Sequence, residues 1–145
     1  MPSHSHSFHS LSFLSFWFND NVLCFTAPSM PPANITGYNT SSTSIRLIWN
    51  QVPLKDKNGV IRRFTVRYWQ SSEPINTTEV KEISASEAWY NESSIASSQL
   101  EIFSAEFTNL LIWTNYTFQI RAFTIDYGNF SMPLIIRSDE DSKFA

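Results

Sequence analysis

The chain has 145 residues, a formal net charge of -3 at pH 7 and an aromatic content of 15%. A length of this order suits one domain with a buried core. Binding to nucleic acid depends on clustered Lys and Arg, so the acidic balance argues against a nucleic-acid partner. The sequence contains no run of about 18 apolar residues, so no membrane span is predicted in it, although a parent protein can be anchored elsewhere.

Residues 1–29 are predicted to form a signal-like or disordered N-terminal tail. The tail holds all the histidines of the chain, which are His4, His6 and His9. No Cys or paired carboxylate completes a metal site beside them. Apolar residues gather in 8–18 as in a secretory signal, with Phe25-Thr-Ala27 as a candidate cleavage end, but no Lys or Arg precedes them. Cys24 is the only cysteine, so the fold must hold without an internal disulfide.

Short runs of β-branched and aromatic residues follow the tail and predict an all-β domain over 30–138. Prolines at 28, 31 and 32 mark its start, because proline has no N–H to contribute to a strand ladder. Strands are expected, in chain order, at 35–38, 44–50, 61–70, 106–110, 116–123 and 134–137. The last residues, 139–145, are predicted to be an acidic linker.

Alternation with a period of two predicts which side chains of these strands are buried. In the run 116–123, Tyr116, Phe118 and Ile120 alternate with Thr117, Gln119 and Arg121. We therefore expect one buried face and one solvent-exposed face there.

The order of these motifs resembles the fibronectin type III family over about Pro31 to Asp141. The matching segments are Pro31-Pro32, Ile45-x-Leu47-x-Trp49, Phe64-x-Val66-x-Tyr68, Phe107-Thr-Asn-Leu110 and Trp113-Thr-Asn-Tyr116. The resemblance implies a seven-stranded immunoglobulin-like β-sandwich with Trp49 and Tyr116 in the core, and with the Tyr116 hydroxyl bonded to backbone a few residues upstream. It also implies that Asn58-Gly59 crosses between the sheets, although this dipeptide usually signals a hairpin.

The connection 71–103 is longer than the usual connection of the family and is expected to be variable. Ser84-x-x-Glu87 within it fits a capping box that starts a helix, but a surface loop is the preferred interpretation.

No catalytic, cofactor-binding or metal-binding residue is predicted. The domain has no histidine to activate a hydroxyl nucleophile, and no glycine-rich phosphate loop occurs. The chain is therefore interpreted as non-enzymatic and free of cofactors.

N-x-S/T triplets recur along the chain and are candidate N-glycosylation sites. They begin at Asn34, Asn39, Asn76, Asn91, Asn115 and Asn129. Chance would produce about two or three in a chain of this composition, so the excess favours a glycosylated secretory protein. Chance matches in a sequence rich in Ser, Thr and Asn are the alternative.

The candidate protein-binding face is the outward side of two strands that neighbour each other in the family. It comprises Arg63, Arg67, Trp69, Arg121 and Phe123. Arginine and tryptophan are typical interface anchors, but the same residues also suit a cation–π ladder that only stiffens the sheet.

The preferred function is a non-catalytic binding and spacer module of an extracellular or cell-surface adhesion, receptor or matrix protein, with other proteins as partners. Two alternatives stay open. One is a cytosolic repeat of a giant muscle-type scaffold, and the other is an accessory domain of a secreted carbohydrate-active enzyme.

Overall fold

The computed structural model describes residues 25–93 and 100–140. The signal-like segment, the histidines and Cys24 lie outside the described residues, as does 141–145 of the predicted acidic linker. The expectations for those segments therefore remain predictions.

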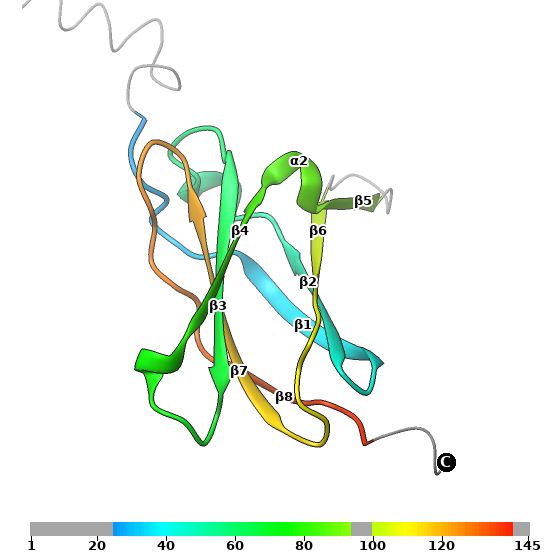
Figure 1. The fold of residues 1–145 in the computed structure, drawn as a ribbon. Helices are drawn as coiled ribbons and strands as arrows, with labels where there is room; N and C mark the ends of the chain where they lie inside the picture. Colours follow the sequence, from blue (N-terminus) through cyan, green and yellow to red (C-terminus); the bar gives the residue numbers. More distant parts are fainter. Residues whose placement is uncertain (1–24, 94–99, 141–145) are drawn as a thin grey trace, which may run out of the picture.

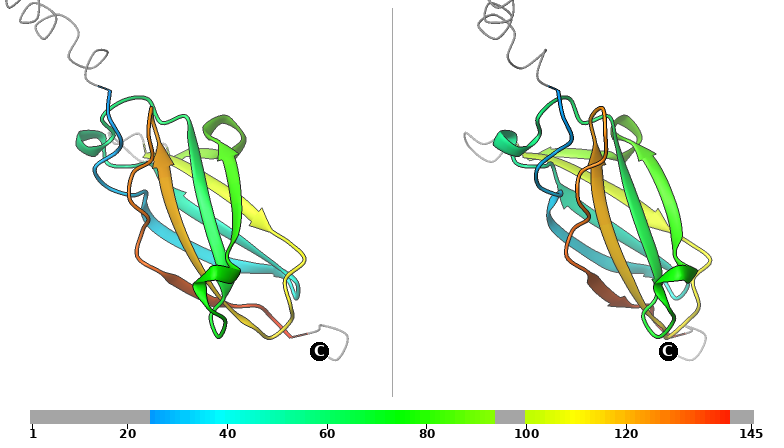
Figure 2. Two further views of the ribbon diagram at one scale, coloured as in Figure 1. Left: turned by 60° about the vertical axis from the view of Figure 1, so that its left-hand side comes forward. Right: turned by 90° about the vertical axis from the view of Figure 1, so that its left-hand side faces the viewer.

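Two four-stranded antiparallel sheets pack face to face, as Figures 1 and 2 show. The first sheet has the order β1 (Ala33–Ser41), β2 (Ser44–Asn50), β6 (Leu100–Phe107) and β5 (Trp89–Ser93). The second has the order β4 (Glu79–Ser84), β3 (Arg63–Gln70), β7 (Asn115–Phe123) and β8 (Leu134–Arg137). Within the described residues the helices are short: η1 (Leu54–Asp56), η2 (Ile75–Thr77) and α2 (Ala85–Ala88). The all-β sandwich class is confirmed, with one strand more than the seven expected.

The core forms where the inward side chains of the two sheets meet. Trp49 is 0% exposed, and its ring centroid lies 5.3 Å from that of Phe64 and 6.4 Å from that of Phe103. These aromatic residues come from both sheets, so the core joins the two layers. Their inward positions follow from strand alternation, because every second side chain of a strand points to the same face.

Several expected strands differ in their bounds: β1 is longer than the expected 35–38, β3 begins at Arg63 and not at 61, and the strand before the β6–β7 turn is displaced most. The expectation placed a strand at 106–110, whereas β6 runs from Leu100 to Phe107. The chain turns after β6, where Asn109 adopts a φ of 59° and the backbone N–H of Leu110 donates to the carbonyl of Thr43 at 2.9 Å. Strand β2 and strand β8 have the bounds that the sequence predicted.

The long connection 71–103 holds β4, α2, β5 and the start of β6. The loop interpretation of Ser84-x-x-Glu87 is wrong, because α2 begins there and the Ser84 Oγ accepts from the Glu87 backbone N–H at 3.2 Å. Strand β4 was not predicted, because it is an edge strand whose only buried residue is Ile83 and its sequence therefore shows no alternation of buried and exposed side chains.

The passage between the sheets is where the family resemblance implied it. Strand β2 belongs to the first sheet and β3 to the second, so the segment with Asn58-Gly59 crosses between them and is not a hairpin turn.

Residues Phe25–Ser29, here called the N-terminal strap, pack onto this crossing segment. The backbone N–H of Thr26 donates to the carbonyl of Asn58 at 3.0 Å, and Asn58 Nδ2 donates to the carbonyl of Ala27 at 3.1 Å. Figure 2 shows the strap, in blue, beside the orange connection that follows β7. The described chain therefore enters at one end of the sandwich and leaves at the other (Figure 1).

Candidate functional site

Strands β3 and β7 bring four of the five predicted face residues together. In the antiparallel register Arg63 pairs with Phe123, and Thr65 pairs with Arg121, with Arg67 two residues further along β3. These four side chains therefore share the outward face of the second sheet. Trp69 pairs with Thr117 two residues beyond Arg67, so strand alternation places it on the same face, at the far end of β3.

Arginines and aromatic rings alternate along this face in one cation–π ladder. The Arg63 guanidinium carbon lies 3.7 Å from the Phe123 ring centroid. The Arg121 carbon lies 3.8 Å from the Tyr127 centroid and 4.5 Å from that of Phe130. The Arg67 carbon lies 3.8 Å from the Phe130 centroid. A single contact of this type contributes about 0.5–1 kcal/mol at an exposed site. The contacts of the ladder connect side chains of β3, β7 and the segment that follows β7.

The three guanidinium groups of the ladder differ in their polar partners. Arg63 Nε lies 3.6 Å from a carboxylate oxygen of Glu82, and Arg67 Nε donates to Gln119 Oε1 at 2.8 Å. Arg121 Nε is buried and has no acceptor among the described residues. Burial lowers the pKa of Arg67, and the nearby charge of Arg121 lowers it further. Ring faces thus supply much of the electrostatic compensation here.

Tyr127 and Phe130 are the ladder members that the sequence analysis missed. They reach the face because the chain after β7 folds back along it, with the Gly128 N–H donating to the Ala122 carbonyl at 2.9 Å. The Ser131 N–H likewise donates to a β7 carbonyl, at 2.8 Å. Aromatic residues after a strand are the only sequence signal, and this signal does not show that the segment returns. Tyr127 and Phe130 thus cover part of the predicted binding face with the protein's own side chains.

The candidate glycosylation sites differ in accessibility. Exposed side chains in the described residues are Asn34, Asn76, Asn115 and Asn129. Asn39 is only partly exposed, and its amide links two strands: Nδ2 donates to the carbonyl of Arg137 at 2.9 Å, and Oδ1 accepts from the Asp139 N–H at 3.1 Å. Asn91 lies in β5.

The two residues expected in the core have defined surroundings. Trp49 is fully buried between the sheets. Tyr116 is 6% exposed, and its hydroxyl oxygen accepts from the Leu111 backbone N–H at 2.8 Å. That contact reaches five residues upstream, which holds the turn between β6 and β7 against the core.

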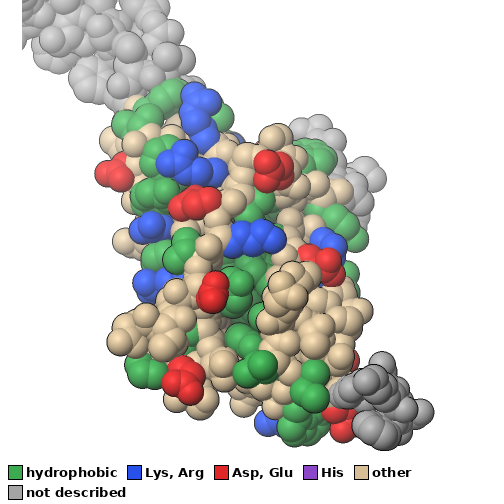
Figure 3. Space-filling view, viewed as in Figure 1, with side chains coloured by type: hydrophobic (Ala, Val, Ile, Leu, Met, Phe, Trp, Pro, Cys, Tyr) green, Lys and Arg blue, Asp and Glu red, His purple; other side chains and the backbone are tan. Residues whose placement is uncertain are grey.

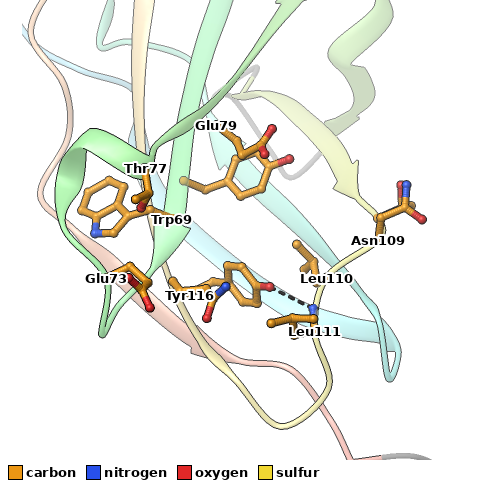
Figure 4. A pocket seen from close by; sticks show the side chains of 11 residues that line it. Trp69, Glu73, Thr77, Glu79, Asn109, Leu110, Leu111 and Tyr116 are labelled. Carbon is orange, nitrogen blue, oxygen red and sulfur yellow. Dashed lines mark hydrogen bonds between the residues drawn. The ribbon is translucent and has the colours of Figure 1, made fainter.

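A cleft of about 610 Å³ opens where the β3–β4 connection faces the β6–β7 turn (Figure 4). Its lining comprises Tyr68, Trp69, Gln70, Glu73, Thr77, Glu79, Thr108, Asn109, Leu110, Leu111 and Tyr116. Sequence reasoning assigned only Trp69 among these to a candidate site. Because the lining comes from separate segments of the chain, no local sequence motif predicts the cleft.

The described residues contain no group of three His, Cys, Asp or Glu side chains placed to hold a metal ion. None of the helices within 25–93 and 100–140 is long and apolar enough to cross a membrane.

Comparisons with known proteins agree with the fold. The family described as Fibronectin type III domain matches residues 30–137. The chain is 29% identical over 117 residues to mouse Receptor-type tyrosine-protein phosphatase F, which covers 80% of the chain and 5% of that protein. It is 30% identical over 115 residues to human Cell adhesion molecule DSCAM, which covers 79% of the chain and 5% of that protein. The chain thus spans a small part of these relatives.

Among solved structures, the fn3 domain of human contactin 1 superposes with a TM-score of 0.62 at 20% identity, covering 84% of this chain and 87% of that domain. This likeness supports the fold of two facing sheets.

Proposed function

The chain belongs to the fibronectin type III family, and from this premise we propose that it is a non-catalytic protein-binding and spacer module of an extracellular adhesion, receptor or matrix protein. The family module is itself non-catalytic, and its relatives carry receptor and adhesion names. The proposal extends this module-level description to the whole chain.

The observation that carries the spacer role is the position of the two ends of the described chain. The N-terminal strap enters at one end of the sandwich, and the described chain leaves at the other (Figure 1). When the chain enters and leaves a domain at opposite ends, neighbouring domains can be arranged one after another in a line. The matched relatives are about twenty times longer than the matched segment, because it covers 5% of each.

The outward face of β3 and β7 has a structural role in this proposal. Tyr127 and Phe130 cover the guanidinium groups of Arg67 and Arg121, so a partner would have to displace them to reach those groups. These ring contacts support a role of the ladder in stabilising the sheet. A binding surface is then expected on another part of the domain.

N-glycosylation is the feature that separates the extracellular proposal from the cytosolic alternative. We place the glycans first at Asn115 and Asn129, whose side chains are exposed. Asn39 should be modified least, because its amide already bridges β1 to the segment after β8.

The test is expression behind a working secretion signal, followed by treatment with an N-glycosidase and gel electrophoresis. The wild type should shift in mobility, and Asn115→Gln with Asn129→Gln should shift less. Asn50→Gln, outside any triplet, is the matched control and should behave as the wild type. Absence of any shift contradicts the extracellular proposal and favours a cytosolic repeat.

A further inference from the structure

Two opposite walls and an aromatic floor define the cleft between the β3–β4 connection and the β6–β7 turn. Figure 4 shows Glu73, Thr77 and Glu79 on one side, Asn109 and the two leucines on the other, and Tyr116 between them. Tyr68 adds a further ring to the lining, whereas the ring of Trp69 lies on the other side of β3, away from Tyr116 (Figure 4). In Figure 3, hydrophobic side chains run along the middle of the molecule between polar ones on either side. The surroundings therefore suit a flat group that packs against rings.

The charges of the cleft are all of one sign. Glu73 and Glu79 are exposed, and no Lys, Arg or His belongs to the lining. Elsewhere carboxylates have cationic neighbours: Glu82 lies near Arg63 at 3.6 Å, and Glu106 lies near Arg46 at 3.9 Å. Within the described residues, no such ion pair involves either cleft carboxylate.

The two tyrosines of the cleft have different surroundings. Burial raises the pKa of Tyr68, and the charge of Glu79 raises it further. The Tyr116 hydroxyl oxygen accepts from the Leu111 N–H, and its own hydrogen has no acceptor among the described residues. Since Tyr116 is 6% exposed and lines the cleft, this hydrogen is available to an acceptor on a ligand.

One kind of occupant satisfies all these groups. A guanidinium is planar, stacks on aromatic faces and forms forked hydrogen bonds with carboxylates, whereas an ammonium is a compact and strongly hydrated charge. A peptide carbonyl next to it supplies the acceptor for Tyr116. We propose that the cleft binds an arginine side chain, with its flanking backbone carbonyl, on a partner protein. This inference rests on the proposed binding role and names the chemistry of the partner.

The net charge of the chain favours the same kind of partner. A formal charge of -3 attracts basic surfaces and accelerates their encounter at low salt.

The test uses the full chain labelled with ¹⁵N and titrated with the blocked peptide acetyl-Gly-Arg-Gly-amide, followed by NMR chemical shifts. Shift changes should concentrate at Tyr68, Leu110 and Leu111. The same peptide with citrulline in place of arginine keeps the shape without the charge, and it should bind about tenfold more weakly.

Charge removal in the protein is the second arm. Glu73→Gln combined with Glu79→Gln should weaken binding of the arginine peptide by about tenfold. The matched control is Glu87→Gln, an exposed carboxylate on α2 at the other end of the sandwich (Figure 1), and it should leave the affinity unchanged.

Several results would overturn the inference. They are equal binding of the citrulline peptide, unchanged affinity in the doubly substituted protein, or shift changes located on the cation–π ladder. Equal binding of a lysine peptide would overturn the assignment to arginine. The glycosidase test is independent: a chain without glycans that still binds the arginine peptide removes the extracellular proposal and leaves the cleft assignment standing.

Discussion

Trp49 shows how one side chain joins the two sheets and at what cost. It is fully buried against Phe64 and Phe103, yet its Nε1 has no hydrogen-bond acceptor among the described residues. A buried donor without a partner costs free energy, so the packing of the ring must outweigh this loss. Trp49 therefore stabilises the fold through the packing of its apolar ring and not through a hydrogen bond of Nε1.

We expect Trp49→Ala to lower the free energy of unfolding by about 3–5 kcal/mol, through lost burial and a cavity. This is a large part of the roughly 5–15 kcal/mol typical of a domain. Trp49→Phe should cost clearly less, because it also removes the unpaired N–H. Urea unfolding measures both, with Leu54→Ala, at an 86% exposed position, as the control. An unchanged midpoint in Trp49→Ala would show that the core is assigned wrongly.

We expect Tyr68 to make the stability of the fold depend on pH in the alkaline range. Its pKa is raised by burial, then by Glu79 and Tyr116, so the folded protein keeps the phenol proton to a higher pH than the unfolded chain. Between the unfolded pKa of about 10 and the higher folded pKa, the unfolded state binds fewer protons and gains stability relative to the fold. The contribution is complete below about pH 10 and decreases above it.

Tyr68→Phe should accordingly reduce the loss of stability above about pH 10. Urea unfolding at a series of pH values checks this, with Tyr38→Phe, on the exposed side of β1, as the matched control. If the two variants lose stability in parallel from neutral to alkaline pH, Tyr68 does not carry this effect.

The element that braces the second sheet is the backbone after β7 together with the ladder beneath it. Gly128 and Ser131 bond back to β7, and this pairing places Tyr127 and Phe130 over the arginines. Each ring lies against guanidinium groups from different strands, so the ladder ties β3, β7 and the returning segment into one unit.

We expect Phe130→Leu to destabilise the domain by about 1–2 kcal/mol, because it removes ring contacts with Arg67 and Arg121 and keeps most of the apolar volume. The comparison is Ile125→Leu, in the same connection but 58% exposed, which should stay within about 0.5 kcal/mol. Chemical unfolding decides between them. Equal stability of the two variants would mean that the ladder contributes nothing measurable.

Residues that precede the first strand contact two connections of the domain. The N-terminal strap bonds to Asn58, and the Thr124 hydroxyl donates to the carbonyl of Thr26. The ring of Phe25 lies 3.3 Å from the position that a Cβ on Gly59 would take, where the φ of 153° already favours glycine. The strap therefore joins two connections at the same end of the sandwich.

A chain that starts at Pro28 should be less stable than one that starts at Phe25, by about 1–3 kcal/mol from the lost hydrogen bonds. Thermal unfolding of the two chains measures the difference, and a third chain starting at Asn21 is the control for length. Cleavage after Ala27, which the sequence offers as a candidate, would produce the weaker form. Identical melting of all three would show that the strap is not part of the folded unit.

Features of the fold that depend on a few neighbouring residues could be predicted from the sequence. Strands β2 and β8 and the burial of Trp49 could be predicted because alternation along a few residues records which face is buried. Strand β4 was missed because an edge strand with one buried residue has no such record. Helix α2 was recognised as an alternative from its capping box but not preferred, because a four-residue helix has little more than its cap.

The sequence alone was sufficient for the two-sheet class, the crossing at Asn58-Gly59 and the shared face of Arg63, Arg67 and Arg121, since these depend on strand periodicity and motif order. The cover by Tyr127 and Phe130, the strap and the cleft required three dimensions. Each of these three features brings together segments that are far apart in the chain, or depends on how a connection folds back. A local sequence pattern does not show which distant segments will be in contact. The rings of Tyr127 and Phe130 came to lie over the arginines, and Glu73 and Glu79 came to line one cleft with Tyr116, only through tertiary packing.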